Sequence, residues 1–206
     1  FTSTTTSSQT PGFIEDSRRR MSCCSRSLGS AINAGQMIRF SFFYAGHGTN
    51  IEDLDGDEED GLDEVLCFME PDGSPNYLTD DEIAEVLLND FKEQTTIVVV
   101  TDCCNSGSVC DLVKEEFGAR PIVHFAAVQD EQSAHDVGDG GVFTASLLET
   151  IEEFCEEGRR EYSVTSLFNA CVERYNPDAG EDQDFAFEAS PLLDVDTIKW
   201  PLIPPD

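Results

Sequence analysis

Residues 95–107 read TTIVVVTDCCNSG, and the architecture can be worked out from this stretch. The first seven residues are mostly β-branched, which is typical of a strand buried on both faces of a parallel sheet. The strand runs into an Asp-Cys-Cys-Asn-Ser-Gly turn, so two thiols follow at its carboxyl end. In open parallel sheets, ligands bind beyond the carboxyl ends of the strands. We therefore expect a reactive site at this turn.

A second strand of similar character lies upstream. Residues 37–44, MIRFSFFY, form a nearly continuous apolar run that ends at the glycine-flanked His47. If the two strands are parallel neighbours, the imidazole of His47 and the thiol of Cys104 face one crevice. Such a pair is the minimum for thiol-protease chemistry, because the imidazole takes the thiol proton and the thiolate attacks a carbonyl carbon.

Glycines next to both residues suit this chemistry. Gly48 lets a peptide backbone approach the imidazole, and the turn that contains Gly107 offers backbone N–H groups of the kind that an oxyanion hole needs. A histidine or a cysteine at the end of a strand is also common without any catalytic role, as a turn residue or a small apolar residue. The spacing of the two residues is therefore not sufficient evidence by itself.

The rest of the chain alternates between strands and helices. Thr79 is an expected N-cap, and Glu82 completes a capping box at the start of a helix that extends to Phe91. The sequence also predicts a strand over residues 121–128 and amphipathic helices over 143–155 and 163–175. This order indicates an α/β fold with a mostly parallel sheet flanked by helices. We expect residues 1–35 to be a flexible Ser/Thr/Arg-rich segment, and residues 176–206 to be an acidic tail anchored by Trp200 and Leu202.

The composition narrows the possible partners. The chain has 206 residues, with 42 acidic and 12 basic side chains and a formal net charge of −30. Such a surface repels nucleic acid and anionic lipid and attracts cations and basic peptides. No leader or membrane-spanning run is recognised, so we expect a cytoplasmic protein. With this charge we expect it to bind neither nucleic acid nor membrane, and we expect a monomer. The eight cysteines are then free thiols rather than a disulfide framework.

Acidic residues are densest at positions 52–64, which hold nine carboxylates in thirteen positions. Residues 53–64 also place acids at positions one, three, five, seven and twelve of an EF-hand-like loop. Position six is Glu58, however, where that loop needs glycine, and the preceding element is a strand. A local calcium loop is therefore the weaker interpretation of this segment.

Together, these stretches resemble a known family. Tyr44-Ala-Gly-His-Gly48, the acidic run from Asp53 to Glu64, Leu78-Thr-Asp-Asp-Glu82 and Asp102-Cys-Cys-Asn-Ser-Gly-Ser-Val-Cys-Asp-Leu112 follow one another as in the metacaspases, particularly the type I group. Gln129 to Asp136 and Gly141 to Thr144 continue the resemblance, which covers roughly residues 36–200. It implies a caspase-like fold over residues 36–206, with a large-subunit-like part up to residue 118 and a small-subunit-like part after it.

The resemblance also implies residue roles. His47 matches the catalytic histidine, and Cys104 rather than Cys103 matches the nucleophile. Asp102 matches a carboxylate that binds a P1 Arg or Lys side chain, so the expected substrates are proteins or peptides with basic P1 residues; otherwise Asp102 is a turn residue. The family is commonly calcium-activated. The matching calcium ligands, which could alternatively be ordinary surface acids, are Asp63, Asp80, Asp81 and Asp111.

Three departures from the family pattern keep an alternative open. Ala45 replaces a serine, Asn105 replaces a histidine, and the family's first buried strand is not recognised in residues 1–36. The expected function is a calcium-dependent cysteine endopeptidase. The alternative is a catalytically impaired, calcium-responsive binding or scaffold protein with the same fold.

Overall fold

The structure is a computed structural model that describes residues 39–53, 56, 61–129, 133–134, 141–175 and 183–202. The segment expected to be flexible, residues 1–35, lies outside the described residues, as do the cysteines at positions 23 and 24. Within the described part, no helix is both long and apolar enough to cross a membrane.

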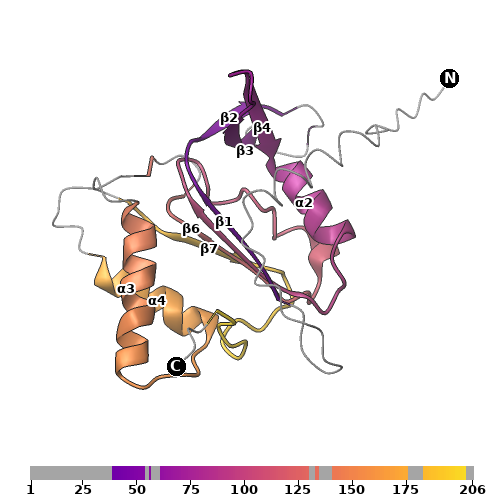
Figure 1. Cartoon of the computed structure of the whole chain (residues 1–206). Coiled ribbons are helices and arrows are strands. Elements are labelled where there is room, and N and C mark those ends of the chain that lie inside the picture. The colour runs from indigo at the N-terminus through magenta and orange to yellow at the C-terminus, as the bar shows by residue number, and fades with distance from the viewer. Residues whose placement is uncertain are drawn as a thin grey trace.

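A four-stranded sheet forms the centre of the fold (Figure 1). Its strands lie in the order β1 (Arg39–Ala45), β5 (Thr96–Asp102), β6 (Ile122–Ala126) and β7 (Ala186–Ala189). The first three are parallel, whereas β7 is antiparallel to β6. The structure thus confirms the predicted α/β class, and the strands that precede His47 and Cys104 are adjacent and parallel.

Alternate residues of β5 point to opposite faces of the sheet, and each face is covered. Ile97 and Val99 belong to the core that includes apolar residues of α2 (Asp80–Asn89). Val98 and Val100 belong to a second core formed with α3 (Val142–Glu156) and α4 (Val164–Arg174). Because every residue of β5 is buried, its run of β-branched side chains reflects a strand packed on both sides.

A second, three-stranded antiparallel sheet projects from the main one. It consists of β2 (Gly48–Glu52), β3 (Leu62–Met69) and β4 (Pro75–Thr79). Residues 54, 55 and 57–60 of the segment with EF-hand-like spacing lie outside the described residues. The elements on either side are the paired strands β2 and β3, and not the two helices of an EF-hand, so the flanks do not support the local calcium-loop interpretation.

Helix α2 begins as predicted. The Thr79 hydroxyl accepts a hydrogen bond from the Glu82 N–H, and the Glu82 carboxylate accepts one from the Thr79 N–H, which completes the capping box. The helix ends at Asn89, slightly before the predicted end at Phe91. The capping box fixes the first turn, which carries two of the predicted calcium ligands, Asp80 and Asp81.

The carboxyl-terminal part is more structured than expected. The short strand β7 lies in a segment that was expected to be only a tail, and a 3-10 turn, η1 (Glu115–Phe117), follows β5. The expected anchors are confirmed: Trp200 is 2% exposed and stacks on Phe125 with ring centroids 5.3 Å apart, and Leu202 packs against the same core.

Candidate active site and acidic site

The parallel pairing of β1 with β5 brings the two predicted catalytic loops together. In this register Ala45 lies opposite Asp102, so both strands end at the same level. The Gly46 N–H donates a hydrogen bond to the Asp102 carbonyl, 3.3 Å away, and continues the pairing beyond the strands. His47 follows one strand and Cys104 the other, at the edge where the sequence placed them.

Backbone and side-chain hydrogen bonds hold the His47 loop in place. The Tyr44 hydroxyl lies 2.8 Å from the His47 carbonyl oxygen and 2.7 Å from the Cys67 carbonyl oxygen. The Cys67 N–H donates to the His47 carbonyl at 2.9 Å. The His47 side chain is exposed, which leaves its imidazole accessible. Tyr44, inside the core, thus positions the backbone that carries the candidate base.

The two adjacent thiols lie in different environments. Cys103 is 1% exposed, and burial, followed by the nearby Cys104 and Asp102, raises its pKa to about 12. Cys104 is half-buried. Since the thiolate is the nucleophile, a thiol held protonated in the core is unreactive near neutral pH. The geometry therefore favours Cys104 over Cys103 as the candidate nucleophile.

The turn around Cys104 is compact. The Ser106 hydroxyl donates a hydrogen bond to the Cys103 carbonyl at 2.9 Å, and Asn105 has a positive φ of 50°. Asparagine tolerates this left-handed conformation better than most residues. Gly107, the second glycine predicted for the oxyanion region, is buried within the same turn.

Gly48 lies directly against the nucleophile turn. A Cβ atom built on Gly48 would lie 2.0 Å from the Cys104 carbonyl oxygen and 3.1 Å from the Cys103 sulfur. Only glycine fits this contact without displacing backbone. Gly48 is therefore a point of close approach between the His47 loop and the Cys104 turn.

Asp102 is buried and interacts with the start of α3. Its Oδ2 accepts a hydrogen bond from the Thr144 N–H at 3.0 Å and a short one from the Thr144 hydroxyl. A Cβ on Gly141 would lie 2.1 Å from that same oxygen, so glycine is needed where the carboxylate meets the helix. Sequence reasoning did not identify Thr144 as a partner, because the two residues lie 42 positions apart.

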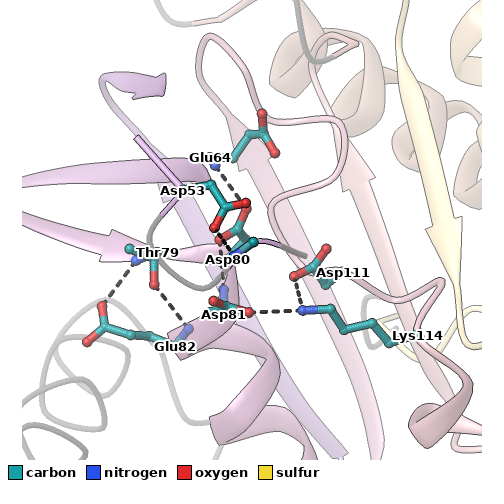
Figure 2. A network of polar contacts seen from close by, with 9 residues as sticks. Asp53, Glu64, Thr79, Asp80, Asp81, Glu82, Asp111 and Lys114 are labelled. Carbon is teal, nitrogen blue, oxygen red and sulfur yellow. Dashed lines mark hydrogen bonds and ion pairs between the residues drawn. The ribbon is translucent and has the colours of Figure 1, made fainter. Parts of the chain in front are cut away.

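Three of the four predicted calcium ligands converge. Asp63, Asp80 and Asp81 each offer a carboxylate oxygen, and these atoms lie within 4.8 Å of one another. Asp63 comes from β3. Asp80 and Asp81 come from the first turn of α2 (Figure 2). Hard oxygen donors at this spacing have the chemistry that calcium prefers.

Asp80 is the most deeply buried member of this group, at 1% exposure. Its two oxygens accept hydrogen bonds from the Glu64 N–H, at 2.9 Å, and the Asp81 N–H, at 2.8 Å. Burial, with a contribution from the nearby Asp111 and Glu64 charges, nevertheless raises the pKa of Asp80 to about 8. A bound cation would favour the ionised carboxylate.

The fourth predicted ligand, Asp111, is linked to this group through a lysine. The Lys114 ammonium lies 2.9 Å from Asp81 Oδ1 and 2.9 Å from Asp111 Oδ2 (Figure 2). Asp111 has a positive φ of 49°, which aspartate tolerates better than most residues. Sequence analysis did not single out Lys114, because its partner Asp81 lies 33 positions away.

The fold and the two adjoining strand ends define a caspase-like α/β protein. A solved structure, protein GSU0716 from Geobacter sulfurreducens, has the same fold with a TM-score of 0.52. The two sequences are 23% identical, and the superposed region covers 87% of this chain and 73% of the solved chain. The family description "Metacaspase, peptidase C14 domain" matches residues 5–113, which is more than half of the chain. The chain belongs to the metacaspase family.

Curated relatives support this assignment. Metacaspase-1 of Candida glabrata is 30% identical over 136 residues, which cover 65% of this chain and 33% of the relative. Metacaspase-1 of Pyricularia oryzae is 27% identical over 161 residues, which cover 77% of this chain and 36% of the relative. Metacaspase-1A of Aspergillus terreus is 41% identical over 71 residues, which cover 34% of this chain and 17% of the relative. The matched part of this chain thus spans about a third or less of these relatives.

Proposed function

We propose that this chain is a calcium-dependent cysteine endopeptidase that cleaves after Arg or Lys. The observation that supports this most strongly is the register of β1 against β5, which places Ala45 opposite Asp102 and starts both catalytic loops at one edge. The family assignment supports the peptidase class. The buried Cys103 beside the half-buried Cys104 supports the choice of nucleophile.

The chemistry follows from these two residues. His47 accepts the thiol proton of Cys104, and the thiolate attacks the carbonyl carbon of the scissile peptide bond. The tetrahedral intermediate collapses as the C–N bond breaks, and protonated His47 gives its proton to the leaving amine. Water, deprotonated by His47, then hydrolyses the thioester and regenerates the thiol. Backbone N–H groups near Gly48 and Gly107 are the candidate oxyanion donors.

Asp102 is the proposed partner of a basic P1 side chain. It is 6% exposed and lies two residues from the nucleophile. A carboxylate in a narrow site favours a guanidinium or an ammonium and disfavours a carboxylate, which would meet like charge. Its contact with Thr144 holds the carboxylate in one orientation, so the same side chain would both anchor α3 and select the substrate.

Calcium is the proposed cofactor. The close oxygen atoms of Asp63, Asp80 and Asp81 fit a hard divalent cation, and Asp111 approaches the same group through Lys114. Bound calcium would neutralise the mutual repulsion of these carboxylates. Because they connect β3, α2 and the loop after Cys104, the cation would fix the acidic sheet relative to the nucleophile turn.

Turnover of fluorogenic peptide amides tests this function. The wild-type chain should release the fluorophore from peptides with P1 Arg or Lys in calcium and much more slowly in a chelator. The same peptides with P1 Asp should be poor substrates, and Cys104→Ala should be inactive. Robust P1 Asp cleavage, or full activity in chelator, would contradict the proposal. A folded, calcium-binding chain without turnover would instead favour the binding or scaffold alternative.

A further inference from the structure

Lys114 lies where the proposed calcium site meets the nucleophile loop. It follows the turn of Cys104 and directly precedes η1. Its ammonium is 2.9 Å from a carboxylate oxygen of Asp81, in the first turn of α2, and 2.9 Å from one of Asp111. Figure 2 shows the ammonium between the two carboxylates, in contact with both. One positive charge thus joins two of the four proposed calcium ligands.

Partial solvent exposure allows the Lys114 ammonium to move away from its carboxylate partners. The Lys114 side chain is 29% exposed and that of Asp81 is 31% exposed, whereas that of Asp111 is 7% exposed. A lysine has a flexible four-carbon stem and a strongly hydrated ammonium, so it can exchange a carboxylate partner for water at small cost. A divalent cation has twice its charge and binds several oxygens at once. Bound calcium would therefore compete with the ammonium for Asp81 and Asp111.

We propose that Lys114 is a tethered counter-ion of the calcium site, which holds Asp81 and Asp111 together without calcium and is displaced when calcium binds. This inference rests on the proposed calcium site and adds a regulatory element to it. The ammonium stabilises the calcium-free fold because it offsets repulsion among the acidic side chains. It also raises the calcium concentration at which the site fills, because calcium must replace it.

Calorimetric calcium titration and thermal unfolding of Lys114→Gln test this proposal. Glutamine keeps the stem length but removes the charge. Calcium should bind this variant at least about threefold more tightly than the wild type, the effect of losing a partly exposed ion pair. In chelator its Tm should be lower than that of the wild type, and saturating calcium should remove most of that difference. Lys114→Arg, which keeps the charge, should stay close to the wild type.

Lys199→Gln is the matched control. It removes the same charge from a lysine that pairs with Glu161 at 2.6 Å, where both side chains are largely exposed. It should leave calcium affinity nearly unchanged, so the effect of Lys114 can be separated from that of net charge. Equal or weaker calcium binding in Lys114→Gln would overturn the proposal while leaving the calcium site intact. Absence of calcium heat in both the wild type and Lys114→Gln would overturn the site itself, and the role of Lys114 with it.

Discussion

At the residue scale, Asp102 accepts hydrogen bonds from the first turn of α3, and in the proposed function it also binds the P1 side chain. Asp102→Asn keeps an oxygen that can accept the Thr144 N–H but removes the charge. We expect turnover of P1 Arg peptides to fall at least about tenfold, since a charge-assisted hydrogen bond is lost, while the Tm changes little. Peptide kinetics and thermal unfolding of the same preparation measure both effects.

Thr144→Val is the control for the structural role of this contact. It removes the hydroxyl that donates to Asp102 and should cost about 1 kcal/mol of unfolding free energy. It should not reverse the preference for basic P1 residues. If Asp102→Asn lowers stability as Thr144→Val does and leaves peptide turnover intact, Asp102 only anchors the helix.

Tyr44 acts on the candidate base through the backbone. Its hydroxyl contacts the carbonyl oxygens of His47 and Cys67, so Tyr44→Phe leaves two carbonyls without this partner. We expect a loss of about 1–2 kcal/mol in the free energy of unfolding. The kcat should fall more than the KM rises, because the loop that carries His47 loosens.

Denaturant unfolding and steady-state kinetics check this expectation. Tyr77→Phe serves as the comparison, since Tyr77 lies on β4 and is 41% exposed. Wild-type kcat in Tyr44→Phe would show that the hydroxyl does not position the histidine.

The element scale shows what the sequence could predict and what it could not. The buried strand over residues 95–101 and the capped helix from Thr79 were recognisable because hydrophobic runs and capping residues are local signals. Strand β3 was missed because Asp63 and Glu64 are buried in it, although acidic residues normally indicate surface. The four-residue strand β7 is too short for a period to be visible.

In the candidate site, too, some features could be predicted from the sequence and others could not. His47 and Cys104 follow recognisable strands, so their meeting at one edge could be expected from topology. The bonds of Thr144 to Asp102 and of Lys114 to Asp81 join residues far apart in sequence. A single sequence holds no signal for contacts of this kind, because they depend on how the elements pack.

The junction between β2 and the nucleophile turn gives an element-scale prediction. In Gly48→Ala, the new methyl group would overlap the Cys104 carbonyl oxygen, which is backbone and cannot rotate away. We expect the turn to shift and peptide turnover to fall by at least about a hundredfold, as displacement of a catalytic group by about 1 Å can do.

Thr49→Ala, one residue further along β2 and exposed, is the control for a general weakening of this strand. Both variants should be compared by peptide turnover and by Tm. Near-wild-type activity in Gly48→Ala would mean that the two loops are not held in the contact described.

Charge dominates at the scale of the whole molecule. With a formal net charge of −30, the chain attracts divalent cations and basic substrates over a distance that salt controls. Both calcium affinity and kcat/KM for P1 Arg peptides should decline as sodium chloride rises from about 0.01 M to 0.15 M, over which the Debye length shortens from about 30 Å to 8 Å. Calorimetry and kinetics across this series measure the two slopes. Calcium affinity that does not change with salt would mean that long-range attraction by the net negative charge does not contribute to calcium binding.

The most direct measurement is covalent labelling of the nucleophile, which tests the nucleophile, the base and the acceptance of P1 Arg in one experiment. A peptidyl chloromethyl ketone with P1 Arg should alkylate a single sulfur: the thiolate attacks the methylene carbon and chloride leaves. Peptide-mapping mass spectrometry can identify the alkylated sulfur. We expect labelling of Cys104 in calcium, slow labelling of the same residue in His47→Ala, and no labelling in Cys104→Ala. Label on Cys103 in the wild type, or no label on a folded, calcium-saturated chain, would contradict the account.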